Sequence, residues 1–222
     1  GINRYGQLGL GSVRSSGSPR QVGSDNDWAL VVAGANSSCA TKANGTLWCW
    51  GRNQYGQLGI GSATDTLVPT QVGVSTNWRT ITKARNHACG IRDDGTLWCW
   101  GDNARGQAGI GMTSNRVVIP TQVGTADTWS SVTVGSTQSC ALKIDGTLWC
   151  WGFNNQGQLG DGTFQNRSVP TQVGTSTDWL SVKAGFSFSC GLRTDGARWC
   201  WGQNTHGQFG DGRADSDGVS VP

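Results

Sequence analysis

Short apolar and aromatic runs, separated by glycine and polar residues, recur along the whole chain. In the first period they cover residues around 28–32, then 38–42 and 46–50. Runs of this length that are rich in β-branched and aromatic residues and bounded by Gly or Asp-Gly are typical of strands. The pattern therefore predicts an all-β chain in which neighbouring strands form antiparallel hairpins.

The set of runs returns with a period of 50 or 51 residues. Each period contains a Trp and then two cysteines, of which the second is flanked by Trp on both sides, as in Trp48-Cys49-Trp50. An Asn-led loop with Gly-Gln-x-Gly follows, and a loop of variable length leads to a Pro, such as Pro69. Self-similarity at such a period is the signature of a repeat architecture. We assign one repeat domain, 1–222, with repeats at about 1–50, 51–100, 101–151 and 152–201 and a partial repeat at 202–222.

The last two strands of each period are joined by three residues that end in Gly, such as 43–45 in the first repeat. This is the signature of a hairpin loop built on a type I turn and closed by Gly in the left-handed region. The turn places Lys42 opposite Thr46, and counting back along both strands places Cys39 opposite Cys49. The register is therefore predicted by the turn.

The same count pairs two cysteines in every repeat. At a non-hydrogen-bonded position of an antiparallel ladder the Cα atoms lie about 4.5 Å apart, close enough for a disulfide. Buried free thiols beside Trp are the alternative, whereas the spacing within a pair does not suit a zinc site. We predict four bridges and hence an oxidising, extracellular location, secreted or at the cell surface. The bridges are Cys39–Cys49, Cys89–Cys99, Cys140–Cys150 and Cys190–Cys200.

Composition agrees with an all-β chain and narrows the partners. The chain has 35 Gly, 12 Trp and 14 acidic residues, all of them Asp, so it is poor in the residues that favour surface helices. The net charge is +3, and the basic residues are spread along the chain without a cluster. We therefore expect no nucleic-acid partner. No apolar run is long enough to span a membrane.

Residues that could support catalysis do not recur. His87 and His206 stand at non-equivalent positions, so no repeated acid–base pair or nucleophile triad is indicated. The Gly-x-Gly at 59–61 lacks the Gly-Lys-Ser/Thr of a phosphate-binding loop. Asp161 and Asp211 offer few oxygens for calcium and are interpreted as solvated turn residues. We predict no enzymatic activity, no metal and no cofactor.

The succession Trp-Cys-Trp-Gly, Asn-x-x-Gly-Gln-Leu-Gly-x-Gly and Pro resembles the regulator of chromosome condensation repeat family, over essentially the whole chain. The resemblance implies a β-propeller of four-stranded blades, usually seven, with one blade from each repeat. It also implies a structural role for His87, which matches a His that the family often carries before the Cys. Because residues 202–222 repeat the content of 1–19, we expect four full repeats and a partial fifth. They would belong to a larger ring of about seven blades, or to an assembly of copies through open terminal blades.

Positions that differ between otherwise equal repeats are candidates for binding specificity. Two sets vary, and the hairpin geometry places both at the strand ends away from the Asp-Gly turns, on one face of the propeller. Tyr, Arg, Phe and His on one face have the composition of a contact surface, and ordinary loop drift is the alternative. The predicted face contains Tyr5, Tyr55, Arg105, Gln156 and His206 from the Asn-led loop, and Asn36, Asn86, His87, Gln138 and Phe188 from the residues before the first Cys.

Three functions are compatible with these features. The first is an extracellular or cell-surface scaffold for adhesion or assembly, with a protein or glycan partner. The second is a secreted inhibitor of an enzyme, because a secreted propeller of similar repeats blocks a β-lactamase. The third is guanine-nucleotide exchange on a small GTPase with chromatin contact, the founding activity of the family. Four stapled hairpins and the lack of a basic tail favour the first over the third.

Overall fold

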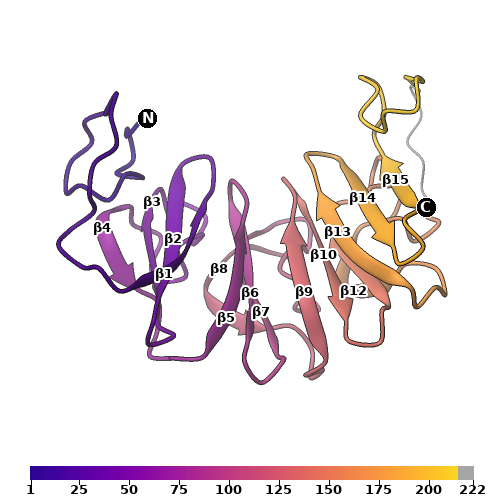
Figure 1. Cartoon of the computed structure of the whole chain (residues 1–222), viewed down its shortest axis with the longest axis horizontal. Coiled ribbons are helices and arrows are strands. Elements are labelled where there is room, and N and C mark those ends of the chain that lie inside the picture. Colours follow the sequence, from indigo (N-terminus) through magenta and orange to yellow (C-terminus); the bar gives the residue numbers. More distant parts are fainter. Residues whose placement is uncertain (215–222) are drawn as a thin grey trace.

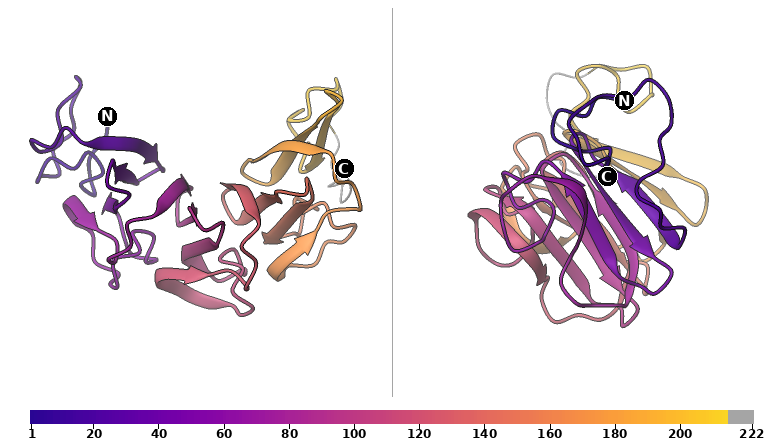
Figure 2. Two further views of the ribbon diagram at one scale, coloured as in Figure 1. Left: turned by 60° about the horizontal axis from the view of Figure 1, so that its bottom comes forward. Right: turned by 90° about the vertical axis from the view of Figure 1, so that its left-hand side faces the viewer.

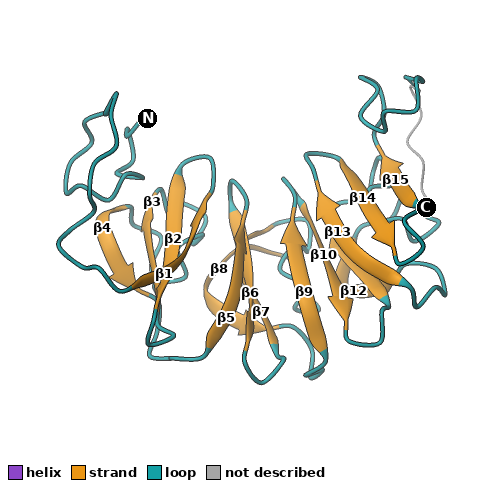
Figure 3. Cartoon of the chain, in the orientation of Figure 1, coloured by secondary structure: helices purple, strands orange, loops and turns teal. Residues whose placement is uncertain are grey.

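The computed structural model describes residues 1–214 and shows, in this part, strands and loops without a helix (Figures 1 and 3). No helix in the described part is therefore long and apolar enough to cross a membrane. Of the predicted partial repeat at 202–222, residues 215–222 lie outside the described residues. Three sheets have four strands and the last has three, all antiparallel. They are β1 (Trp28–Ala33), β2 (Ser37–Lys42), β3 (Leu47–Gly51) and β4 (Thr66–Gln71); β5 (Trp78–Lys83), β6 (His87–Arg92), β7 (Leu97–Asn103) and β8 (Ser114–Gln122); β9 (Trp129–Val134), β10 (Gln138–Lys143), β11 (Leu148–Gly152) and β12 (Arg167–Gln172); and β13 (Trp179–Ala184), β14 (Phe188–Arg193) and β15 (Arg198–Gly202).

The four sheets follow one another along an open arc, with the first and the fourth sheet at its opposite ends (Figure 2). Within each sheet the strands lie in sequence order, and the first strand contacts the first strand of the next sheet, as β5 contacts β9. The first strands therefore line the inner side of the arc, and β4, β8 and β12 lie on its outer side. Sheets arranged in this way are the blades of a β-propeller, which confirms the predicted fold class.

The blades are shifted along the chain relative to the repeats. The first blade takes β1 to β3 from the first repeat, but β4 (Thr66–Gln71) lies beyond residue 50, in the second repeat. The Asn-led loop carries the chain from the inner strands back to the outer edge, so the fourth strand always follows it. After the Asn-led loop, the chain therefore adds the fourth strand to the same blade before it enters the first strand of the next blade.

The register follows the hairpin turns. Cys39 pairs with Cys49 across β2 and β3, and the N–H of Lys42 donates to the carbonyl oxygen of Thr46 at 3.0 Å. Gly45 closes the turn with a φ of 76°. The two Cα atoms of this cysteine pair are 4.1 Å apart, and the other three pairs show the same separation. All four predicted disulfides are confirmed.

We expect Gly95→Ala to destabilise the protein more than Gly196→Ala. The two glycines close equivalent turns with φ values of 79° and 87°, so both alanines would be strained by about 1–2 kcal/mol. A Cβ on Gly95 would in addition collide with the carbonyl oxygen of Asp127, whereas a Cβ on Gly196 would meet nothing within 4 Å. Urea unfolding measures the difference, and equal losses would contradict the role assigned to the Asp127 contact.

Each blade has two chemically different sides. One side, here the tryptophan side, carries Trp98 and Trp100, which pair across the strands with Gly90 and Ala88. The other, the disulfide side, carries the Cys89–Cys99 bridge and faces the next blade, where the Cys89 sulfur lies 3.9 Å from the Ser139 hydroxyl. Every joint within the arc therefore packs a disulfide side against a tryptophan side.

The outer strands are edge strands, and each contains a proline. Pro69 lies in β4, Pro120 in β8 and Pro170 in β12. Proline has no N–H to donate, so it weakens an edge as a template for an added strand. The recurring Pro therefore protects the outer side of the arc against edge-to-edge pairing.

Candidate functional site

A buried asparagine organises the Asn-led loop in each repeat. The Oδ1 atom of Asn53 accepts the N–H of Leu58 at 2.9 Å, and its Nδ2 atom donates to the carbonyl oxygens of Ser62 and Thr64 at 3.0 Å. Asn53 is fully buried, so three otherwise unpaired backbone groups are satisfied by one side chain. The equivalent asparagines Asn3, Asn103, Asn154 and Asn204 are also fully buried. The recurring Asn is thus a structural residue of the loop.

The recurring glutamine joins the same loop to the next blade. The side-chain Oε1 atom of Gln57 accepts the N–H of Tyr55 at 2.9 Å. The backbone carbonyl oxygen of Gln57 accepts the indole N–H of Trp100 at 3.2 Å. Tyr55 is thereby held at the loop face, which we define as the strand ends away from the Asp-Gly turns: segments 34–36 and 52–65 and their equivalents. At the same loop position, Tyr5, Tyr55 and Gln156 are half-buried, and Arg105 and His206 are exposed.

Two arginines on the loop face stack on aromatic rings of neighbouring loops. The guanidinium carbon of Arg52 lies 4.7 Å from the ring centroid of Tyr5, and that of Arg105 lies 4.8 Å from the ring centroid of Phe153. Such cation–π contacts contribute about 0.5–1 kcal/mol at exposed sites. Stacking fixes the plane of each guanidinium while its edge can still donate to a partner.

Two residues of the second predicted set are wrongly placed on a binding face. His87 and Gln138 are fully buried between blades. His87 Nε2 shares a hydrogen bond of 3.0 Å with the Ser139 hydroxyl, and Gln138 Nε2 donates to the carbonyl oxygens of Gly185 and Phe188 at 3.2 Å. This position lies on the disulfide side, so its side chain faces the next blade. Its variation between repeats reflects the neighbouring blade that each side chain contacts.

The other members of that set lie at the border of the loop face. Asn36 and Asn86 are half-buried, and their carbonyl oxygens accept the N–H groups of Arg52 and Asp102 at 2.9 and 2.8 Å. Phe188 is half-buried on the disulfide side of the fourth blade. The two asparagines therefore connect the inner and outer loops of the loop face through their backbone.

The loop face differs in composition from the turn face, which comprises the Asp-Gly turns and the segments that precede each first strand. The loop face carries five large apolar residues whose exposed fractions are 51–72%: Ile2, Val13, Met112, Phe164 and Phe186. Its arginines include Arg4, Arg14, Arg52, Arg85, Arg105 and Arg213, and its acidic residues are Asp65, Asp102, Asp161 and Asp211. The turn face exposes Val74 and Ile144 and carries most of the acidic residues: Asp25, Asp27, Asp93, Asp94, Asp127, Asp145, Asp178 and Asp195. Protein interfaces are enriched in aromatic residues, Met and Arg and depleted in Asp, which favours the loop face as the contact surface.

On the turn face, a basic side chain lies between two tryptophans in every blade. In the second blade the guanidinium carbon of Arg92 lies 3.8 Å from the ring centroid of Trp98 and 4.9 Å from that of Trp78. The indole N–H of Trp98 donates to the Thr96 hydroxyl at 2.8 Å, and that hydroxyl donates to Asp94 at 2.6 Å. Lys42, Lys143 and Arg193 occupy the same position in the other blades. Sequence reasoning missed these stacks, although a basic residue recurs before every hairpin turn.

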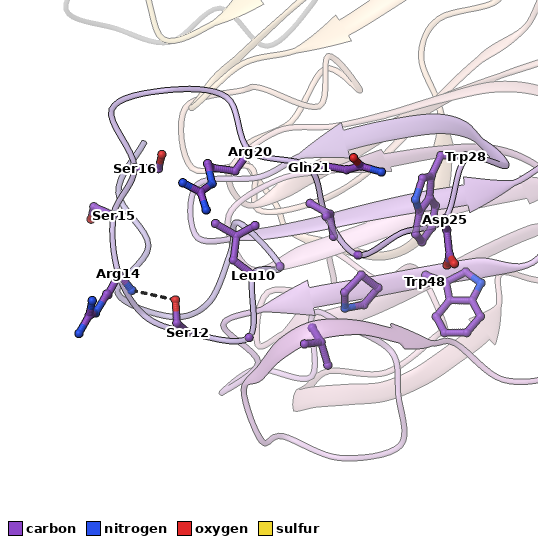
Figure 4. Close-up of a pocket in the computed structure, with 16 residues that line it drawn as sticks. Leu10, Ser12, Arg14, Ser15, Ser16, Arg20, Gln21, Asp25, Trp28 and Trp48 are labelled. Atoms are coloured by element: carbon purple, nitrogen blue, oxygen red, sulfur yellow. Dashed lines mark hydrogen bonds between the residues drawn. The ribbon is translucent and has the colours of Figure 1, made fainter.

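A hollow of about 750 Å³ lies beside Trp28 and Trp48 of the first blade (Figure 4). Leu10, Arg20 and Asp25 also line it (Figure 4). A smaller hollow of about 290 Å³ lies one period later. It is lined by Ile60, Val72, Trp78 and Pro120, which are equivalent to Leu10, Val22, Trp28 and Pro69 of the first hollow. The part of the lining that the two hollows share therefore belongs to the packing of successive repeats.

Asp161, which we interpreted as a solvated turn residue, is engaged inside its loop. Its side chain is 2% exposed and pairs with Arg167 at 2.6 Å, while the Thr163 hydroxyl donates to it at 2.7 Å. Burial alone would raise the pKa of this carboxyl, but these hydrogen bonds outweigh burial and hold the pKa below its usual value. The interpretation is wrong, because the ion pair replaces solvent. Residues 1–214 show no cluster of three His, Cys or Asp side chains placed to hold a metal.

Several solved structures have the same fold. Human WBSCR16 superimposes with a TM-score of 0.85 at 23% identity, over 99% of this chain and 60% of that protein. Yeast Prp20, solved in complex with Kap60, gives 0.79 at 23% identity, over 88% of this chain and 48% of that protein. A structure of Prp20p from Saccharomyces cerevisiae, described together with its binding to Gsp1p and histones, gives the same values for TM-score and identity. The chain thus spans about half to three fifths of the length of these propellers.

A sequence search of curated proteins returned no match. Two family models described as "Regulator of chromosome condensation (RCC1) repeat" do match the sequence. One covers residues 1–41, 44–91 and 145–192, and the other covers 28–57, 85–107, 129–158 and 179–208. The matched segments hold the Trp-Cys-Trp strands and the Asn-led loops described above. The chain belongs to the regulator of chromosome condensation (RCC1) repeat family.

Proposed function

We propose that this chain is an extracellular or cell-surface binding scaffold that contacts a protein partner through its loop face and performs no catalysis itself. The observation that carries the proposal is the contrast between the faces. The loop face combines the stacked arginines Arg52 and Arg105 with exposed apolar side chains such as Phe186, whereas the turn face is rich in Asp. Prp20, a similar propeller, was solved bound to a protein.

The disulfides support the extracellular part of the proposal. All eight cysteines are paired, and the first three bridges are fully buried. Such bridges persist where thiols are not kept reduced. The protein purified from its natural source should therefore resist thiol alkylation until it is reduced, as read by intact mass. Eight alkylated thiols without reduction would contradict this location.

The loop face is tested by crosslinking and by matched variants. A photoreactive residue at Phe186, compared with one at Ile144 on the turn face, should capture a protein from the extracellular fraction of the source organism. Binding of that protein, measured by calorimetry, should weaken at least tenfold in Arg105→Glu and Phe186→Ala, as expected for central contact residues. Asp94→Ala and Ile144→Ala should leave the affinity unchanged.

The outcome also separates the alternatives. A captured enzyme whose activity falls on binding would make the chain an inhibitor, and a captured small GTPase would support nucleotide exchange. Loss of binding in the turn-face variants, or retention in both loop-face variants, would contradict the proposed contact surface.

A further inference from the structure

The joint between the first two blades is built differently from the other joints. In the other blades a serine of the second strand donates its hydroxyl to the carbonyl oxygen of the Gln in the preceding loop, always at 2.9 Å. These pairs are Ser38 with Gln7, Ser139 with Gln107 and Ser189 with Gln158. In the second blade the equivalent residue is Ala88, which has no side-chain donor.

Lys83 supplies the missing hydrogen bond. Its Nζ atom donates to the carbonyl oxygen of Gln57 at 2.8 Å. Lys83 is the cross-strand partner of Ala88, so the two substitutions lie side by side and compensate one another. The positions equivalent to Lys83 hold small or aliphatic residues, namely Ala33, Val134 and Ala184.

The replacement exchanges a neutral donor for one that can carry a charge. Lys83 is 9% exposed, and it forms no ion pair within residues 1–214. Burial lowers the pKa of Lys83 to about 7. The facing segments 34–36 and 56–61 contain no ionisable side chain. On its own strand, Arg79 donates to the carbonyl oxygen of Trp129, away from Lys83.

The nearest other ionisable side chain on the adjacent strand is His87, which points to the opposite side of the sheet, toward Ser139 of the third blade. Burial, followed by the charge of Lys83, lowers the pKa of His87 to about 3. His87 Nε2 is bonded to Ser139, while Nδ1 is buried without a partner in the described structure. A proton added to either residue therefore enters a site that offers no negative charge.

We propose that this joint is a proton-responsive hinge: charging of Lys83 releases loop 56–61 from the second blade. Lys83 binds a proton more weakly in the closed joint than in water. The closed joint therefore loses stability as pH falls from about 10.5 to 7. Loop 56–61 follows Tyr55, so opening of the hinge would rearrange the loop face. The hinge is independent of whether that face binds a partner.

Hydrogen exchange tests the hinge against an internal control. The N–H of Gly59 donates to Gly56 within the hinge loop, and the N–H of Gly61 donates to Val118 in β8 of the second blade. Gly109 and Gly111 make the equivalent bonds one period later, where the Ser139 hydroxyl takes the place of the lysine as donor. After correction for intrinsic exchange, protection of Gly59 and Gly61 should fall by up to tenfold for each pH unit between about 8.5 and 7, because one proton is bound. Protection of Gly109 and Gly111 should stay constant.

A double variant recreates a joint that the protein already contains. Lys83→Ala with Ala88→Ser copies Ala184 and Ser189 of the fourth blade, and it should abolish the pH dependence at Gly59 and Gly61 while preserving the fold. NMR titration of the Lys83 side chain should give a midpoint near 7. The hinge is refuted if Lys83 titrates as exposed lysines do, if both loops respond equally to pH, or if the double variant retains the response.

Discussion

Replacing Trp151 by alanine is expected to lower the free energy of unfolding by about 3–5 kcal/mol. The side chain is fully buried at the joint between the second and third blades, and its indole N–H donates to the carbonyl oxygen of Gln107 at 3.0 Å. Gly109 approaches the indole so closely that a Cβ there would lie 2.6 Å from Nε1. Truncation would therefore open a cavity that a close-packed joint cannot fill.

Trp199→Ala is the matched control. Trp199 occupies a Trp-Cys-Trp strand like Trp151, but it is 37% exposed. The indole N–H groups of the equivalent Trp98 and Trp149 donate to the hydroxyls of Thr96 and Thr147. The fourth blade has Ala197 at that threonine position, so the Trp199 indole lacks this acceptor. Chemical unfolding should show a loss of about 1 kcal/mol or less. Similar losses for the two variants would mean that packing between blades does not dominate stability.

Removing the Cys89–Cys99 bridge by changing both residues to alanine is expected to cost about 2–3 kcal/mol from chain entropy alone. The loss of two fully buried sulfur atoms adds a packing term. The Cys190–Cys200 bridge closes a loop of the same length, with a sequence separation of 10, but its cysteines are half-buried.

Comparison of the two double variants separates the terms. If constraint of the unfolded chain dominates, both should lose the same stability. If packing contributes, the Cys89/Cys99 variant should lose more, as measured by denaturant unfolding of each variant under non-reducing conditions. A smaller loss for Cys89/Cys99 would contradict both explanations.

The inner three strands of each blade were predictable from the sequence because short-range signals define them. The Gly of the hairpin turn fixes the register, and the register fixes the disulfides; neither depends on distant parts of the chain. The fourth strand was implied by the family resemblance instead. β8 (Ser114–Gln122) contains Pro120 and lies on an edge with one pairing partner, so its sequence shows no clear alternation.

The errors in the predicted face have one cause. Variation between repeats is interpreted as a sign of surface position; Tyr55 and Arg105 do lie on the loop face, whereas His87 and Gln138 are buried between blades. The latter pair varies because each side chain must match a different neighbouring blade. Sequence alone does not show which side of a strand the next blade covers. The pairing of Lys83 with Ala88 was missed for the same reason, since it compensates a contact to a loop of another repeat.

The alternation of disulfide and tryptophan sides gives the array a direction. Because each joint brings together the same two kinds of surface, insertion or loss of a whole period leaves every remaining blade beside a compatible neighbour. A change of half a period would set unlike elements against each other and break the Asn-led loop. The number of repeats can therefore change by recombination between repeats. A contact that occurs at one joint and is not repeated at the others, such as His87 with Ser139, instead depends on the same two blades remaining neighbours.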